Sequence, residues 1–242
     1  MILLDIEGTT TPIAFVTGTL VPYARTHLRT YLERHAGSPH GAVLIEAVRR
    51  ECEADPDAGT ASGQPWGKGE QLVAAAAAYL AGLMDRDRKS TALKELQGYI
   101  WEQGYRSGAL VAPVYPDVEP AFVRWRAGGQ MLAIFSSGSV LAQQWLFRCS
   151  TAGDLTPHLQ SYWDTHTGPK REPSSYHRIA ALSDTTPAAV LFLSDVAAEL
   201  DAARAAGMTT ALVDRPGNAP QPAHDHRVIR SFDEIDRVSS RR

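Results

Sequence analysis

Short, mostly apolar runs recur along the chain and are separated by longer stretches with apolar residues at helical spacing. A run of three to six apolar residues between polar turns is typical of a strand that is buried on both faces of a parallel sheet. The predicted strands are residues 2–4, 131–135, 189–193 and 208–213, with a brief strand at 162–163 and a last edge strand at 227–229.

Helical stretches follow most of these strands. Two of them end at glycine, a common helix stop: one at Gly128 and the other at Gly207. The predicted helices are 117–128, 140–147, 173–182 and 196–206. Strands that alternate with helices in this way predict an α/β fold, in which a parallel, Rossmann-like sheet is covered by helices on both faces.

The segment between the first two strands has a different pattern. Apolar residues recur there at helical spacing in four stretches, 21–35, 41–54, 70–84 and 88–101, and a Gly-, Pro- and Ser-rich loop covers 55–69. No strand pattern appears in this segment. We therefore expect a core domain of residues 1–14 and 114–242, with an all-helical domain of residues 15–113 inserted after the first strand and hinges near 16–18 and 108–114.

Composition narrows the possible partners and the compartment. The 242 residues are 44% hydrophobic and 21% charged, and the formal net charge of −3 does not favour nucleic acid or an anionic membrane surface. Two cysteines far apart in sequence favour unpaired thiols in a reducing compartment. Without a signal-peptide pattern or an apolar run of about 20 residues, the expected location is the cytoplasm.

Chemically useful side chains stand where predicted strands end. In an open parallel sheet, ligands bind at the carboxyl ends of the strands, so these side chains should meet at one edge. A lysine in a Gly-Pro-Lys turn precedes one of the predicted helices. The candidate residues are Asp5, Glu7, Ser136, Ser137, Asp195 and Lys170.

Together these residue types suit phosphoryl transfer. A carboxylate such as Asp5 can attack phosphorus and form an aspartyl-phosphate. Two anions repel unless a cation such as Mg²⁺ lies between them, and Mg²⁺ is usually held by one or two carboxylates with phosphate and water. Glu7 can protonate a leaving oxygen and later activate water, while a lysine and a strand-end hydroxyl can bind phosphate oxygens. Each residue alone could instead be an ordinary helix cap, turn residue or surface charge.

The ordered set resembles the motifs of the haloacid-dehalogenase-like hydrolase superfamily. Within it, the segment Asp5-Ile6-Glu7-Gly8-Thr9-Thr10-Thr11-Pro12-Ile13 is similar to the bifunctional enolase-phosphatases of methionine salvage, and so is the segment 87–98 of the insert. Residues 136–140 and 192–195 carry the same likeness. The resemblance extends over nearly the whole chain.

This resemblance implies an acireductone synthase with a Rossmann-like core and a helical cap. The implied substrate is 2,3-diketo-5-methylthiopentyl-1-phosphate, a small-molecule phosphate that is enolised and then dephosphorylated to 1,2-dihydroxy-3-keto-5-methylthiopentene. It implies a monomer with one Mg²⁺ per subunit. The implied metal-site residues are Asp5, Glu7 and Asp195, of which Asp5 and Glu7 are catalytic, and the implied substrate-binding residues are Ser136, Ser137 and Lys170.

Three further expectations complete the sequence-based picture. Glu199 and Asp201, at the start of the helix after Asp195, are candidates for supporting the metal site from outside. Another small-molecule phosphatase of the same superfamily is the alternative that shares the core motifs. A non-catalytic, phospho-accepting switch domain is the alternative from another class, since such domains also combine acidic residues, a hydroxyl and a lysine at strand ends.

Overall fold

The computed structural model describes residues 1–58, 66–88 and 90–235. The chain divides into two compact units. One, here called the core unit, comprises Met1–Gly18 and Gly108–Arg242, and the other, the helical unit, comprises Thr19–Ser107. The chain therefore passes between the two units at residues 18/19 and 107/108. The sequence pattern predicted these crossings a few residues away, at 14/15 and 113/114.

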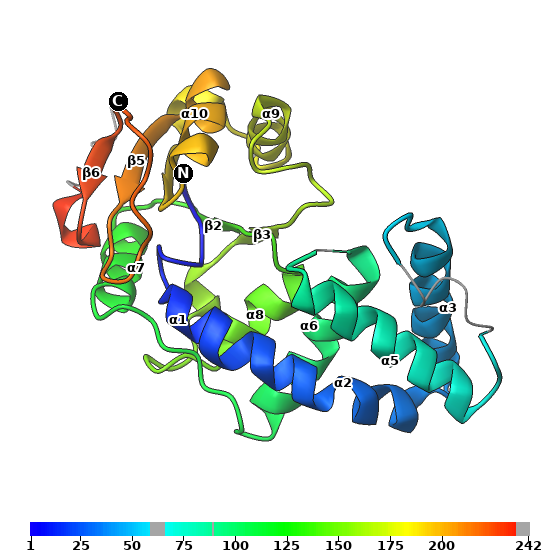
Figure 1. Cartoon of the computed structure of the whole chain (residues 1–242). Coiled ribbons are helices and arrows are strands. Elements are labelled where there is room, and N and C mark those ends of the chain that lie inside the picture. Colours follow the sequence, from blue (N-terminus) through cyan, green and yellow to red (C-terminus); the bar gives the residue numbers. More distant parts are fainter. Residues whose placement is uncertain (59–65, 89, 236–242) are drawn as a thin grey trace. The chain divides into compact units, whose positions relative to one another are not determined.

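The core unit is built on six strands that run parallel in one sheet (Figure 1). Their order across the sheet is β3-β2-β1-β4-β5-β6. The strands are β1 (Ile2–Leu4), β2 (Leu132–Phe135), β3 (Ser161–Trp163), β4 (Leu191–Ser194), β5 (Thr209–Val213) and β6 (Arg227–Ile229). The predicted parallel sheet is thus confirmed, and its order is that of a Rossmann fold.

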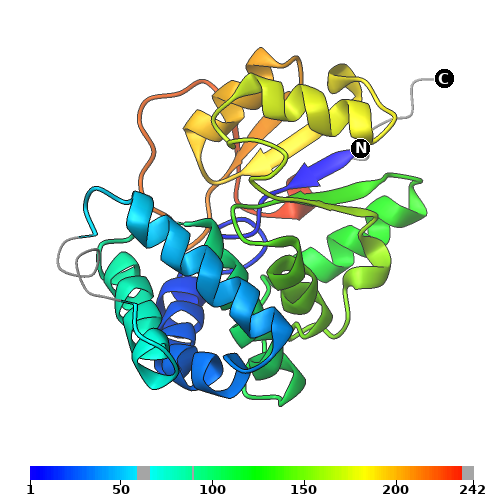
Figure 2. The ribbon, with the colours of Figure 1, turned by 90° about the vertical axis from the view of Figure 1, so that its right-hand side faces the viewer.

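Helices cover both faces of this sheet, as Figure 2 shows most clearly. Helices α9 (Pro173–Leu182) and α10 (Ala197–Ala205) lie on one face, and α7 (Val118–Ala127) and α8 (Val140–Arg148) lie on the other. Short turns complete the unit: α1 (Ile13–Phe15) and the 3-10 turns η2 (Thr156–His158), η3 (Pro187–Ala189) and η4 (Phe232–Glu234). The π-helical turn η1 (Val16–Leu20) spans the boundary between the two units.

Burial on both faces explains why the central strands are almost wholly apolar, with Ser194 at the end of β4 as the polar residue. Leu3 of β1 and Phe192 of β4 pack with Tyr176 and Ile179 of α9, and all four side chains are fully buried. Ile2 and Leu4 alternate to the opposite side of the strand and are also fully buried. Burying each such side chain stabilises the fold by about 1.5–3 kcal/mol, so β1 is anchored firmly although it has only three residues.

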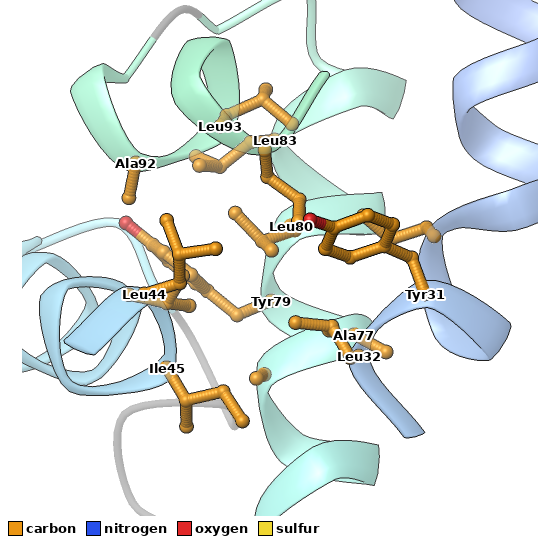
Figure 3. Close-up of a cluster of buried hydrophobic side chains, with 14 of the residues drawn as sticks. Tyr31, Leu32, Leu44, Ile45, Ala77, Tyr79, Leu80, Leu83, Ala92 and Leu93 are labelled. Carbon is orange, nitrogen blue, oxygen red and sulfur yellow. The ribbon is translucent and has the colours of Figure 1, made fainter. Parts of the chain in front are cut away.

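The helical unit contains α2 (Val21–His35), α3 (Pro39–Ala54), α5 (Glu70–Asp85) and α6 (Thr91–Arg106). Their inward-facing side chains form a separate hydrophobic core, in which Leu44, Leu80 and Leu83 are buried (Figure 3). Serine side chains cap two of the helices: Ser38 Oγ accepts from Gly41 N at 3.0 Å, and Ser90 Oγ accepts from Leu93 N at 3.1 Å.

The structure differs from the sequence-based expectation at residues 13–20, and part of the expected loop at 55–69 is not described. The chain is helical from Ile13 onward through η1, which the pattern missed because Val16, Thr17 and Gly18 favour helix only weakly. Of the expected loop at 55–69, residues 59–65 lie outside the described residues. Among the helices that are described, none has the length and apolar character needed to cross a membrane.

Candidate active site

Asp5 lies at the point where the order of the sheet reverses. It follows β1 directly, and its backbone N–H donates to Leu193 O of β4 at 2.9 Å. Because β1 lies between β2 and β4, chain crossovers leave in opposite directions here, which opens a space at the carboxyl ends of the strands. The Asp5 side chain is buried at this edge, with only 5% of the residue exposed.

Lys170 reaches Asp5 from the turn before α9. Its Nζ donates to Asp5 Oδ1 at 2.7 Å and lies 2.6 Å from Glu199 Oε2. Tyr176 of α9 holds this turn in place, because its hydroxyl donates to Lys170 O at 2.6 Å. Burial alone would lower the pKa of Lys170, but the charges of Asp5 and Glu199 outweigh it and raise the pKa, so the ammonium stays charged.

Asp195 follows β4 and completes the acidic cluster. Burial, and next the charge of Asp5, raise the pKa of Asp195 to about 7 despite the opposing effect of Lys170. Burial and the charge of Asp5 also raise the pKa of Glu199. Three carboxyl groups thus share one lysine, and the cluster carries excess negative charge when all of them are ionised.

Glu199 and Asp201, on the helix after Asp195, were both expected to support the metal site, but the structure gives them different partners. Glu199 Oε2 accepts from Ser194 Oγ at 3.0 Å and contacts Lys170, so it positions the lysine. The expectation for Asp201 is wrong: its exposed carboxylate pairs with Arg204 at 2.9 Å and with His226 at 3.1 Å. Residues two apart on a helix point about 200° apart, so only one of them can face the cluster.

Gly8 allows the loops after β1 and β4 to approach each other. Its φ is +67°, and a Cβ at this position would lie only 2.4 Å from Asp195 Oδ2. Any side chain here would therefore displace the Asp195 carboxylate and would also strain the left-handed backbone. The glycine of the Asp-Ile-Glu-Gly segment is required by this close approach.

The remaining sequence-predicted residues lie on the loops after β2 and β1. Ser136 follows β2 and is buried, with its N–H donating to Trp163 O at 3.1 Å and its Oγ accepting from Gly138 N at 3.3 Å. Ser137 is half-buried beside it. Glu7 is half-buried on the β1 loop, where its backbone forms a bridge with Thr11.

Sequence reasoning missed three residues that shape these loops. Gln143 of α8 is almost fully buried, and its Nε2 donates to Gly138 O and to Trp163 O, both at 2.9 Å. Arg215 donates from Nε to Thr9 O at 3.3 Å, and Asn218 donates from Nδ2 to Gly8 O at 2.9 Å. Gln143 could have been found from the sequence, because a polar residue on the buried face of an apolar helix is unusual. Nothing in the sequence around Arg215 and Asn218 indicated their contacts.

The donor set suits a magnesium ion. Within the described residues, no three His, Cys, Asp or Glu side chains form a group that could hold a metal by themselves. Mg²⁺ does not need one, because it usually takes one or two carboxylates and completes its shell with phosphate and water. The unbalanced charge of Asp5, Asp195 and Glu199 beside the single Lys170 favours a bound cation, so the residues present fit the ion.

Comparisons of the sequence with known proteins agree on one family. The model of the haloacid dehalogenase-like hydrolases matches residues 1–207. Enolase-phosphatase E1 of Synechococcus elongatus is 51% identical over 234 residues, which cover 97% of this chain and 96% of that protein. Enolase-phosphatase E1 of Sorangium cellulosum is 50% identical over 236 residues, with the same coverage of both chains.

Solved structures give the same result for the fold. The crystal structure of the UTR4 protein of Saccharomyces cerevisiae matches with a TM-score of 0.77 and 35% identity, over 97% of this chain and 99% of that one. A dehalogenase structure at 19% identity, with a TM-score of 0.53, shares the fold alone. The chain therefore belongs to the haloacid dehalogenase-like hydrolases and, among them, to the family of the enolase-phosphatase E1 proteins.

Proposed function

We propose that the protein is a Mg²⁺-dependent enolase-phosphatase, an acireductone synthase of methionine salvage. It converts 2,3-diketo-5-methylthiopentyl-1-phosphate to 1,2-dihydroxy-3-keto-5-methylthiopentene by enolisation and dephosphorylation. The observation that carries the proposal is the buried Asp5 carboxylate, held by Lys170 at 2.7 Å at the reversal point of the sheet, with Asp195 on the adjacent strand. Relatives about 50% identical over nearly the whole chain are named Enolase-phosphatase E1, which supports the combined enolase and phosphatase activity.

In this proposal Asp5 is the nucleophile of the phosphatase step. An Asp5 carboxylate oxygen forms a bond to phosphorus while the bond from phosphorus to the enol oxygen breaks, and Glu7 gives its proton to that oxygen. Glu7 then removes a proton from water, which attacks phosphorus and releases inorganic phosphate and the Asp5 carboxylate. Both steps balance, since Glu7 recovers the proton that it gave away.

Other residues of the site bind and orient the phosphate. Lys170 remains charged between Asp5 and Glu199 and supplies a fixed positive charge for the phosphate oxygens. On the loop after β2, Ser136 offers its hydroxyl, and Ser137 offers its hydroxyl and its backbone N–H.

Asp5 and Asp195 would hold Mg²⁺ with their carboxylates, and Glu7 would do so through its backbone carbonyl, which leaves its side chain free to move protons. When bound, the ion would neutralise phosphate charge and favour loss of a proton next to the substrate carbonyl. Glu7 is the proposed base for that enolisation, and the proton that it takes from carbon leaves it protonated for the phosphatase step. Solvent supplies the proton of the new enol hydroxyl and, at the end of the cycle, takes up the proton that Glu7 carries.

We also propose that the helical unit is the cap of this enzyme and that its loops recognise the methylthio end of the substrate. It has a hydrophobic core of its own, so it can move as one body about the chain crossings. Cys52 and Cys149 are both free, which supports the expected cytoplasmic location.

The test of the nucleophile is the variant Asp5→Asn. This variant should fold, and it should bind Mg²⁺ through the remaining ligands, although more weakly than the wild type. It should release no phosphate from the diketone phosphate. Circular dichroism establishes folding, and a phosphate assay follows turnover. Wild-type turnover by this variant would remove Asp5 from the role of nucleophile, and activity that survives full chelation by EDTA would remove the metal.

A substrate panel separates the proposal from a general phosphatase of the same superfamily. We expect kcat/KM for the diketone phosphate to exceed that for common sugar phosphates by at least tenfold, and enolisation to be visible as a change in ultraviolet absorbance. Equal kcat/KM values across the panel would favour the general phosphatase. A single turnover followed by a stable phosphoprotein would instead favour the switch domain.

A further inference from the structure

The loop after β5 lies against both acidic loops of the site. Asn218, in the turn Arg215-Pro216-Gly217-Asn218, donates from Nδ2 to Gly8 O at 2.9 Å and to Val213 O at 3.0 Å. Two carbonyl acceptors fix which end of the amide is the NH₂ group. The orientation of the amide oxygen, Oδ1, follows from this arrangement.

The Asn218 oxygen borders the same space as the Asp195 carboxylate. A Cβ placed on Gly8 would lie 2.8 Å from Asn218 Oδ1 and 2.4 Å from Asp195 Oδ2. Asn218 Oδ1 is buried, and no donor among the described residues bonds to it. Leaving a buried acceptor without a donor is unfavourable, so a donor from outside the chain would be stabilised at this point.

We propose that Asn218 is a positioning residue of the cation site, whose Oδ1 accepts a hydrogen bond from a water molecule bound to the ion beside Asp195. This inference rests on the proposed Mg²⁺-dependent function. Water bound to Mg²⁺ is a strong donor, and Mg²⁺ keeps several waters when few carboxylates hold it. Groups that orient the ligands of a metal from outside typically change its affinity 10- to 100-fold.

A purely structural role for Asn218 makes a different prediction. The two bonds from Nδ2 hold the β1 loop to β5 whether or not an ion is present. If only these bonds matter, any side chain that cannot donate them should weaken ion binding alike. If Oδ1 matters, a side chain that keeps an oxygen there should preserve binding even though it donates nothing.

The test compares Asn218→Leu with Asn218→Asp in the full chain. Isothermal titration with Mg²⁺ alone gives the affinity, and the melting temperature in EDTA reports the loss of structure separately. We expect the leucine variant to bind Mg²⁺ 10- to 100-fold more weakly than the wild type. The aspartate variant, which keeps an acceptor oxygen and adds a negative charge, should bind Mg²⁺ at least as tightly as the wild type.

Gln221→Met is the matched control from the same loop. Gln221 Oε1 accepts from Ala197 N at 3.0 Å, so its loss loosens the loop without removing an oxygen near Gly8. Its Mg²⁺ affinity should equal that of the wild type. If the leucine variant does not fold, Asn218→Ala takes its place.

Three results would overturn the inference. Wild-type affinity in the leucine variant, equal losses in the leucine and aspartate variants, or an equal loss in Gln221→Met would each leave Asn218 with a structural role only. Failure of the wild-type protein to bind Mg²⁺ is a distinct outcome, since it would overturn the proposed function and the inference with it.

Discussion

Lys170 is the only cation in contact with the acidic cluster within the described residues, and replacing it by methionine tests the electrostatics of the site. The side chain is 9% exposed and lies 2.7 Å from Asp5 Oδ1 and 2.6 Å from Glu199 Oε2. Methionine has a similar length and keeps much of the packing, so Lys170→Met removes mainly the charge. Three carboxyl groups then remain buried together without a counter-charge.

The loss of folding stability expected for Lys170→Met can be worked out from these distances. At an effective dielectric constant of about 20, each contact is worth about 6 kcal/mol of Coulomb energy before the cost of desolvating the charges. Removing one partner from a buried ion pair typically costs about 3–5 kcal/mol of folding stability. We therefore expect Lys170→Met to lower the free energy of unfolding by about 3–5 kcal/mol at pH 8 or so, with no metal present.

The loss should be smaller in acid, because protons can replace the missing charge. Burial and the charge of Asp5 already raise the pKa values of Asp195 and Glu199, and without Lys170 these two pKa values rise further above those of the unfolded chain. A raised carboxyl pKa means that the folded state holds its proton more tightly, so stability falls as pH rises between the unfolded and folded pKa values. The variant should thus approach the wild type near pH 5 and differ most near pH 8.

Urea unfolding in EDTA at both pH values measures this difference. Lys170→Arg keeps the charge and should recover part of the stability, and Arg171→Met removes an exposed neighbouring cation and should change it by less than about 0.5 kcal/mol. A loss below about 1 kcal/mol at the higher pH, or the same loss at both pH values, would refute the reasoning that Lys170 balances a buried negative cluster.

Three further predictions concern the loops, the metal and the helical unit. Gly8→Ala should lower phosphate release more than tenfold, because its Cβ would displace the Asp195 carboxylate; unchanged turnover would contradict the close approach. Mg²⁺ affinity should rise with pH up to about 7, the pKa to which burial and Asp5 raise Asp195, because the ion needs the ionised carboxylate; calorimetry that finds a constant affinity between pH 6 and 8 would contradict this. Ser38→Ala should remove a helix cap and cost about 1 kcal/mol in urea unfolding without changing turnover.

Much of the fold and part of the site followed from the sequence because both depend on strand ends. Short apolar runs indicated the parallel strands. Acidic residues follow two of these strands, and they lie close together because the two strands are neighbours in the sheet. The pairing of Leu4 with Leu193 brings Asp5 and Asp195 to one edge. Lys170 was expected there, and its contact with Asp5 is observed.

Contacts between distant loops were not predictable from local patterns. The direction in which a helix faces decided that Glu199, and not Asp201, meets Lys170. Asn218 and Arg215 reach Gly8 and Thr9 from the far end of the chain, and their turn has the composition of any surface turn. The charge balance that raises the pKa of Asp195 also arises only from the assembled cluster.

The central place of β1 has a consequence for how the protein folds during synthesis. Ile2 pairs with Leu132 on one side and with Leu191 on the other, so β1, the first of the six strands in the sequence, has no neighbour until more than half of this chain has been made. The helical unit, whose contacts are local, is complete long before that point. We expect it to fold first, and the sheet to close late and slowly, because pairing between distant segments must first overcome the entropy of a long loop.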